Sequence, residues 1–255
     1  MQKLALAVLF IALPCLAADS NPDPCNTGFA YTGPKAPQFW GSLRPEWLTC
    51  STGTVQSPIR IINSSPDSRL TPVQIPTSAV ESTFKVENTG HDLKVKNLSP
   101  AWKLKWGNRE ATLDQFHVHV KAEHLLGATQ YDAEIHFVFQ DDHAPGALIV
   151  LTVWVRQQQG GGNGALDKII ANKPGSCATS GQSTQKIKFT DFPVSWNNYY
   201  TYHGSLTTPP CSENVDFIIA SAPMTALQAQ LNALGLVPRP PGNVRPPQTH
   251  GVKRR

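Results

Sequence analysis

The stretch Leu113-Asp114-Gln115-Phe116-His117-Val118-His119-Val120 decides how this 255-residue sequence is interpreted. Alternate residues of a strand point to the same face of a sheet, so His117 and His119 would project together from a strand. On a helix the two rings would diverge by roughly 200° and could not meet at one point. We therefore expect a strand over residues 112–120 that carries two imidazoles on one face.

A second strand is predicted over residues 131–139, and it contains Glu134-Ile135-His136-Phe137-Val138. The connection to the first strand is short and includes Gly127, which suits an antiparallel hairpin. If His136 lies opposite His117 or His119, all three imidazoles share one face, because cross-strand neighbours sit roughly 5 Å apart. Spacing alone leaves two alternatives open, a metal site and a set of packed or exposed histidines.

Three neutral imidazoles with a fourth position left open are typical of a catalytic zinc site, whereas a structural site has four protein ligands. Ligand histidines also need hydrogen-bond acceptors that hold their rings in one tautomer. Gln115 lies two residues before His117, and Glu134 lies two residues before His136, so each would share a face with a ligand. The pattern predicts Zn²⁺ as the cofactor, held by His117, His119 and His136, with Gln115 and Glu134 as acceptors.

The rest of the chain predicts one mostly β domain with a few short helices. Alternating apolar and polar residues predict half-buried strands over residues 84–87, 93–96 and 102–106. The apolar run Leu148 to Val155 predicts a central strand buried on both faces, and Val215 to Ala220 predicts another. Short helices are expected over Ala165 to Ala171 and Thr225 to Leu234. No repeat or linker divides the chain, so we predict a single domain.

The N-terminus predicts export. Lys3 precedes the apolar run Leu4 to Leu13, and small residues follow at Ala17 and Ala18, so residues 1–17 are expected to be a signal peptide and 18–255 the mature domain. The apolar run is too short to span a membrane. A net charge of +4 and a short basic end do not indicate nucleic-acid binding. We expect a secreted protein, extracellular or in a periplasmic or cell-wall space, with no membrane span and no nucleic-acid partner.

Cysteines and glycosylation motifs are consistent with export. Cleavage would leave four cysteines: Cys25, Cys50, Cys177 and Cys211. An even number in an exported chain indicates disulfides, of which four cysteines allow three pairings. None stands in a C-x-x-C pair, which argues against a zinc site made of cysteines. Asn63-Ser64-Ser65 and Asn97-Leu98-Ser99 match the N-glycosylation acceptor, so Asn63 and Asn97 are the predicted sites.

Two blocks surround the predicted ligands: Gln115-Phe116-His117-Val118-His119 with Glu123-His124, and Ala133-Glu134-Ile135-His136-Phe137-Val138. Five further blocks occur elsewhere: Tyr31 through Gly33-Pro34 to Trp40, Gln56-Ser57-Pro58-Ile59, Asn88-Thr89-Gly90-His91, Gly204-Ser205-Leu206-Thr207-Thr208-Pro209-Pro210, and Asn243-Val244-Arg245-Pro246-Pro247-Gln248. In content and order these blocks resemble the α-type carbonic anhydrases, and the short link from His119 to His124 is similar to that of bacterial and plant members. The resemblance spans the chain from about Cys25 to Val252.

This resemblance implies a large, mainly antiparallel, twisted central sheet with a few short peripheral helices and zinc at the bottom of a cleft. It implies a zinc lyase whose zinc-bound hydroxide hydrates carbon dioxide reversibly to bicarbonate and a proton. In carbonic anhydrases the metal is known to lower the pKa of its bound water to about 7. The expected partner is the small-molecule substrate, and the expected state is a monomer or a homodimer.

Individual roles also follow from the resemblance. Thr207 matches the threonine that orients the hydroxide, and Glu123 matches the carboxylate that accepts the hydrogen bond of this threonine. His124 would lie beside the ligands and support them. His91 matches a proton shuttle, which a Gly-His turn would hold at the rim of the cleft, where an imidazole can exchange protons near neutral pH. Tyr31 matches a tyrosine that orders water in the cleft.

The same resemblance assigns the substrate wall and the disulfides. Val138, Val150 and Leu206 match the apolar wall where carbon dioxide sits, and Thr207 and Thr208 line the same cleft. Cys50 and Cys211 match the disulfide of exported members, which leaves Cys25 and Cys177 as the second pair.

Four residues depart from the family pattern: Lys94, Thr89, Phe217 and His203. Lys94 stands where many members have an uncharged polar residue, and Phe217 stands where tryptophan is common. Three alternatives stay open: a storage protein with this fold and little activity, an extracellular matrix protein with a structural metal, and a zinc-dependent hydrolase of small esters.

Overall fold

The structure is a computed structural model, and it describes residues 25–235, 242–248 and 252–254, the last three by their backbone only. The predicted signal peptide, residues 1–17, lies outside these ranges. Within them, none of the helices combines the length and the apolar character that crossing a membrane requires.

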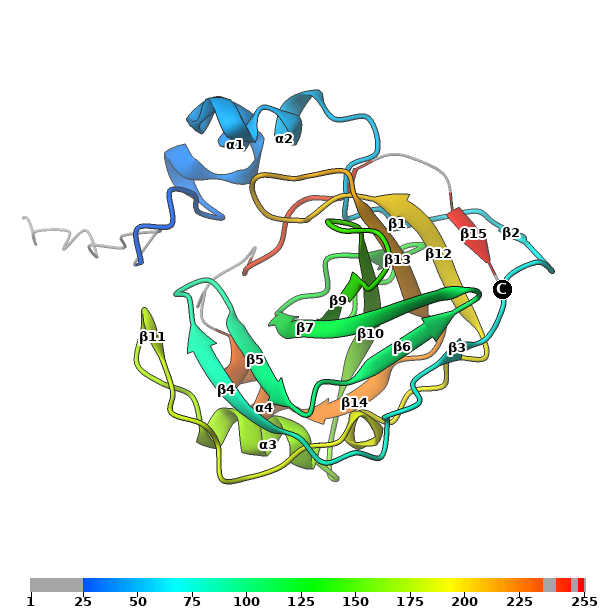
Figure 1. The fold of residues 1–255 in the computed structure, drawn as a ribbon. Helices are drawn as coiled ribbons and strands as arrows, with labels where there is room; N and C mark the ends of the chain where they lie inside the picture. The colour runs from blue at the N-terminus through cyan, green and yellow to red at the C-terminus, as the bar shows by residue number, and fades with distance from the viewer. Residues whose placement is uncertain (1–24, 236–241, 249–251, 255) are drawn as a thin grey trace, which may run out of the picture.

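One sheet forms the body of the molecule (Figure 1). In the described part of the chain it has 13 strands, and its main path runs β11-β4-β5-β7-β9-β10-β13-β12-β15-β2. The longer strands are β4 (Thr83–Asn88), β5 (Leu93–Ser99), β6 (Lys103–Trp106), β7 (Arg109–His119), β9 (Ala133–Asp141), β10 (Leu148–Gln158), β12 (Tyr199–Gly204), β13 (Val215–Ala220) and β14 (Met224–Leu227). The shorter strands are β2 (Ser64–Pro66), β3 (Val73–Gln74), β11 (Ala178–Thr179) and β15 (Val252–Arg254). A separate parallel pair joins β1 (Arg60–Ile61) to β8 (Leu125–Leu126).

Most neighbouring strands are antiparallel, as predicted. The exceptions are β10 with β13, β10 with β14, and β15 with β2, which are parallel. The apolar run that predicted a central strand is β10, and its residues Ile149 to Val155 are buried on both faces. A strand buried on both faces has no polar side to alternate with, which explains its continuous apolar sequence. The predicted fold class, mostly β with one large and mainly antiparallel sheet, is confirmed.

The predicted hairpin pairs β7 with β9 and sets the register of the histidines. His117 lies directly opposite His136, and His119 lies opposite Glu134. Gln115 lies opposite Val138, after a bulge between Leu113 and Gln115. Directly opposed residues project to the same face, so this register gathers all six side chains on one side of the sheet.

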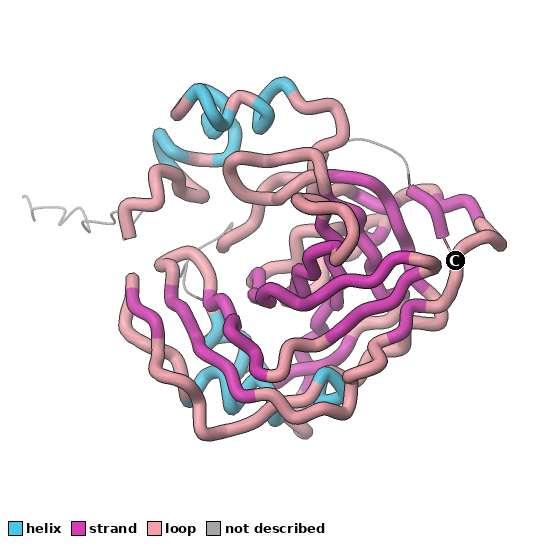
Figure 2. The backbone as a smooth tube through the Cα atoms, in the orientation of Figure 1, coloured by secondary structure: helices cyan, strands magenta, loops and turns pink. Residues whose placement is uncertain are grey.

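Helices are short and peripheral (Figure 2). They are α1 (Trp40–Leu43), α2 (Thr49–Thr52), α3 (Gly164–Ala171) and α4 (Gln228–Leu234), with 3-10 turns η1 (Gly33–Lys35), η2 (Pro37–Phe39), η3 (Pro45–Trp47) and η4 (Phe189–Asp191). Figure 1 shows α1 and α2 at the top of the molecule and α3 and α4 at the bottom. The helix predicted over Ala165 to Ala171 is α3, and Asn163 caps it by accepting from Ala165 N and Leu166 N.

The second helix prediction was wrong in its first part. Residues Thr225 to Leu227 belong to β14, which pairs parallel with the end of β10, and the helix starts only at Gln228. Met224 and Ala226 are buried, whereas Thr225 and Leu227 are half-buried, a period of two that fits a strand. Residues Thr225 to Leu227 therefore form a strand because they pair with β10, although their sequence pattern is helical.

Candidate metal centre and active-site cavity

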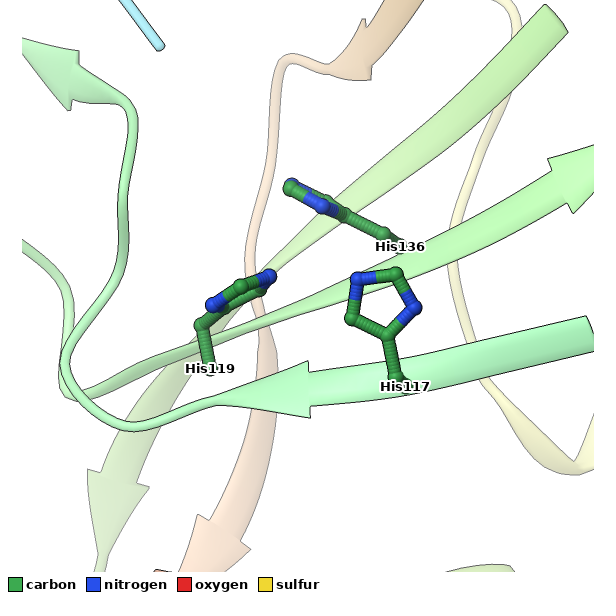
Figure 3. Close-up of side chains that lie close together, drawn as sticks. All are labelled: His117, His119 and His136. Atoms are coloured by element: carbon green, nitrogen blue, oxygen red, sulfur yellow. The ribbon is translucent and has the colours of Figure 1, made fainter. Parts of the chain in front are cut away.

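Three imidazoles meet on the face of the sheet where β7 pairs with β9. Figure 3 shows the rings of His117, His119 and His136 converging on one point. Their centroids lie 4.7–5.3 Å apart, and one nitrogen from each lies within 4.8 Å of the others. The cross-strand register described above produces this convergence, since two rings come from β7 and one from β9.

Hydrogen bonds hold each ring in one tautomer. His119 Nδ1 donates to the carbonyl oxygen of Asn243 at 2.6 Å, and His117 Nδ1 donates to Gln115 Oε1 at 2.9 Å. His136 Nε2 donates to Glu134 Oε1 at 2.5 Å. An imidazole that donates through one nitrogen has a lone pair on the other. The lone pairs therefore lie on Nε2 of His117, Nε2 of His119 and Nδ1 of His136.

Gly242 brings the acceptor of His119 into place. Its φ is +75°, and a Cβ at this position would lie 2.0 Å from the carbonyl oxygen of Val120. Only glycine permits this approach. Asn243 then binds β7 through its own side chain as well, accepting from Val120 N at 2.9 Å and donating to Val118 O at 3.0 Å.

Glu134 is the centre of a buried network behind His136. Its carboxylate accepts from His124 N at 2.9 Å and from His124 Nδ1 at 2.6 Å, in addition to His136 Nε2. The hydroxyl of Tyr202 bridges His124 Nε2, at 2.6 Å, and Ser57 Oγ, at 2.9 Å. His124, Glu134 and His136 also lie close enough to share a metal. Their facing atoms are already joined by hydrogen bonds, so this second group is a positioning network.

Burial keeps two of the predicted ligands, His117 and His136, neutral. It lowers the pKa of His117 well below its usual value, and the neighbouring His119, His136 and Lys94 lower it further. Burial likewise lowers the pKa of His136, although Glu134 opposes the shift. Burial alone would raise the pKa of Glu134, but His124 and His136 outweigh it and hold that pKa well below the usual range. Neutral imidazoles beside an ionised acceptor are the protonation states that a metal requires.

Two buried atoms of the centre lack a hydrogen-bond partner, and they face one another. His119 Nε2 lies 3.4 Å from Glu123 Oε2, and within the described residues neither atom has a partner. Both are acceptors, since Nε2 holds the lone pair and Glu123 is a carboxylate. Leaving two such atoms buried is unfavourable unless a cation or a hydrogen-bond donor lies beside each of them. The donor set of three neutral imidazoles fits Zn²⁺.

The three rings lie beside a cavity of about 340 Å³. His117 and His136 form part of its wall, together with Gln115, Thr207 and Thr208. Much of the remaining wall is apolar, and its apolar residues are Val138, Leu148, Val150, Leu206, Val215 and Phe217. All five residues predicted to surround the substrate therefore line one cavity.

The predicted Thr207–Glu123 pair is close to the centre, but the structure does not join it by a hydrogen bond. Thr207 lies on the cavity wall, and Glu123 is fully buried next to His119. Glu123 Oε1 accepts from Arg245 N at 2.9 Å, whereas Oε2 faces His119. The guanidinium of Arg245 donates to Ser57 O and Cys50 O, which fixes the segment that holds Glu123.

The structure differs from the predicted position of His91. The ring is 3% exposed and is not on the cavity wall. Its Nε2 lies 2.9 Å from Thr27 Oγ1, and the ring stacks on Phe29 with centroids 4.9 Å apart. Tyr31 is also buried away from the cavity wall and packs edge-on against Trp40 and His91. Thr27, Phe29 and Tyr31 of the N-terminal segment therefore cover His91, an arrangement that the local Gly-His turn did not indicate.

Two disulfides hold the segments around the cavity. Cys50 is bonded to Cys211, which follows Thr207 and Thr208 in the chain, and Cys25 is bonded to Cys177. These are the two pairs that the resemblance implies. The second bond anchors the segment that covers His91. Asn63 and Asn97 are both exposed, as glycosylation would require.

Sequence reasoning missed Asn243, Gly242, Tyr202 and Arg245 as parts of the site. Asn243 supports His119 through its backbone carbonyl, which every residue type has, so no side-chain signal marks it. Gly242 acts through a close approach that only the folded chain creates. The block from Asn243 to Gln248 contributed to the resemblance, and it was the available signal for this part of the site.

Comparison with known proteins agrees with this geometry. The model of the eukaryotic-type carbonic anhydrase family matches residues 35–249. The chain therefore belongs to the eukaryotic-type, or α, carbonic anhydrase family, and the prediction of an enzyme of this class is confirmed.

Relatives and solved structures cover nearly the whole chain. A carbonic anhydrase of Pectobacterium carotovorum is 32% identical over 238 residues, which cover 92% of this chain and 91% of the relative. Alpha carbonic anhydrase 3 of Arabidopsis thaliana is 31% identical, with 89% of this chain and 82% of the relative covered. The structure of a hyperthermostable carbonic anhydrase from a hydrothermal vent chimney superposes with a TM-score of 0.80 at 31% identity, covering 89% of this chain and 99% of that one.

Proposed function

We propose that this protein hydrates carbon dioxide reversibly to bicarbonate and a proton, with a zinc ion held by His117, His119 and His136. The observation that carries the proposal is the set of three hydrogen bonds that leaves one lone pair on each ring, directed at a common point. In carbonic anhydrases, zinc held by three histidines is known to lower the pKa of a coordinated water to about 7, which supplies hydroxide at neutral pH.

The cavity wall supports carbon dioxide as the substrate. Val138, Val150 and Leu206 give it an apolar surface beside the imidazoles. A small molecule without charge or strong donors gains by leaving water for such a surface. The apolar side chains also make the surroundings of the rings less polar, which strengthens the electrostatic interactions there.

Thr207 and Glu123 would give the reacting oxygen its orientation. A threonine hydroxyl can donate one hydrogen bond and accept another. If the Thr207 hydroxyl donates its hydrogen to the buried carboxylate of Glu123, the hydroxyl oxygen can only accept a further hydrogen bond. Thr207 would therefore select a reactant that carries a hydrogen. Glu123 Oε1 is already fixed by Arg245 N, and Oε2 has no partner in the described part of the chain. Reorientation of the Thr207 side chain towards Oε2 completes this pair.

Proton release would involve His91 only after the N-terminal segment moves. In the present arrangement Thr27 and Phe29 hold the ring away from the cavity wall. A shuttle must exchange its proton with water, so the role assigned to His91 requires this segment to open.

Stopped-flow carbon dioxide hydration on metal-analysed protein tests the proposal. The wild type should hold one zinc per chain and hydrate carbon dioxide well above the His119→Ala variant. A wild type that holds one zinc and does not exceed that variant would refute catalysis and favour a storage or matrix role. Ester hydrolysis without carbon dioxide hydration would instead identify a small-ester hydrolase.

A further inference from the structure

Three charged side chains line the cavity apart from the histidines. They are Asp92, Lys94 and Asp114. Asp92 is buried, and its carboxylate accepts from Thr89 Oγ1 at 2.5 Å. Asp114 is exposed at the bulge of β7. Lys94 is the one ammonium among the described residues of this wall, and family members often have an uncharged residue there.

The register of the sheet places Lys94 beside the metal centre. Lys94 on β5 lies directly opposite His117 on β7, which in turn lies opposite His136 on β9. One row across three strands therefore carries the ammonium and two of the predicted ligands on the same face.

No carboxylate of the described residues forms an ion pair with Lys94. Glu87 lies opposite Lys94 on β4, but its carboxylate is bound to Lys96 Nζ at 2.5 Å. Within the ranges that the structure describes, Lys94 forms neither an ion pair nor a hydrogen bond, and its side chain is half-buried. A partly desolvated ammonium that forms no ion pair attracts small anions more strongly than one in open solvent.

We propose that Lys94 forms an anion subsite in the cavity, next to His117, that takes small monovalent anions. Bicarbonate is the relevant anion if the proposed function holds, because it is the charged partner of the reaction. Carbon dioxide has no charge, so the subsite distinguishes the two sides of the reaction. The apolar wall formed by Val138, Val150 and Leu206 reduces the screening of this charge by water.

Calorimetric titration of the zinc-loaded protein with thiocyanate and, separately, with bicarbonate tests the subsite. Lys94→Gln should weaken both Kd values by about three- to tenfold, the effect of one charge a few ångströms away under partial screening. Lys94→Arg should restore them to within about twofold, because the charge returns.

Lys85→Gln is the matched control. Lys85 lies on β4, is half-buried and forms no ion pair in the described part of the chain, but it does not line the cavity. This control removes the same charge from the same sheet and should leave both Kd values unchanged. Equal weakening by Lys85→Gln and Lys94→Gln would reduce the effect to net charge and overturn the subsite. A wild-type Kd in Lys94→Gln would also overturn it.

The outcome separates the subsite from the proposed function on which its bicarbonate role rests. Thiocyanate cannot be hydrated, so the change in its Kd caused by Lys94→Gln reports the charge of Lys94 even in a protein without turnover. If the wild type fails to hydrate carbon dioxide and Lys94→Gln still weakens thiocyanate binding, the proposed function falls and the subsite stands. If the wild type hydrates carbon dioxide and Lys94→Gln binds both anions as the wild type does, the proposed function stands and the subsite falls.

Discussion

Gly242 lets the segment of Asn243 lie against the end of β7, and the substitution Gly242→Ala tests whether this contact supports the metal centre. The added Cβ would lie 2.0 Å from the carbonyl oxygen of Val120 and 3.1 Å from its carbonyl carbon. Both atoms belong to the backbone of the strand end, so they cannot rotate away as a flexible side chain would. The segment of Asn243 must therefore retreat.

The size of this retreat determines the effect on zinc. Ordinary contact requires about 3.4 Å, so the segment must move by about 1.4 Å. The hydrogen bond from His119 Nδ1 to Asn243 O is 2.6 Å long, and such a shift takes it beyond hydrogen-bond length. His119 then loses the acceptor that sets its tautomer. Loss of such a partner weakens metal affinity by about 10- to 100-fold.

Zinc affinity measured by competition with a chelator reads this effect, and Gly160→Ala is the control. Gly160 has a φ of +80°, and a Cβ there would meet nothing within 4 Å. Each substitution places alanine in a left-handed conformation, which costs about 1–2 kcal/mol of folding free energy. Only Gly242→Ala should also weaken zinc binding. A wild-type zinc Kd in Gly242→Ala would refute the role assigned to Asn243.

Three further predictions concern Glu134, His91 and Asp141. Glu134→Gln places a donor among the N–H groups of His124 and His136, so zinc affinity measured by chelator competition should fall about 10- to 100-fold; an unchanged affinity would contradict the network. His91→Ala should slow carbon dioxide hydration mainly in weak buffer and recover with added imidazole, and equal rates in weak and strong buffer would leave the ring a structural role only. For Asp141, burial opposes ionisation, but Arg109 and two backbone N–H groups lower its pKa overall. Its stabilisation is therefore present above the unfolded-state pKa near 4 and is lost as the pH falls further. Denaturant titration should show Asp141→Asn about 1–2 kcal/mol less stable at pH 7, with a smaller difference at pH 3, and a constant difference would contradict this assignment.

Alternation in the sequence predicted the half-buried strands β4, β5 and β6, because a period of two can be recognised without knowing which strands lie next to them. The register of β7 and β9 follows from a short connection and from the need to bury one face, so His117 and His136 could be expected to meet. The start of α4 could not be predicted from its own residues. Thr225 to Leu227 pair with β10, and that partner lies far away in the chain.

The predicted ligands and their supporting side chains depended on residue type, which a sequence displays directly. Asn243 contributes a carbonyl oxygen, and Gly242 contributes the absence of a side chain at one close contact. Neither contribution can be recognised from the sequence, because each depends on a contact that only the folded chain makes. The burial of His91 has the same origin, because Thr27 and Phe29 reach it from a segment more than 60 residues away that is anchored by a disulfide.

The most direct test of the account is an anomalous-scattering map of crystals grown with zinc. The hydrogen bonds of the three rings predict one metal peak, bonded to Nε2 of His117, Nε2 of His119 and Nδ1 of His136, at about 2.0–2.1 Å from each nitrogen. A fourth position should face the cavity. A peak between His124 and Glu134, or a fourth protein ligand at the metal, would contradict the account.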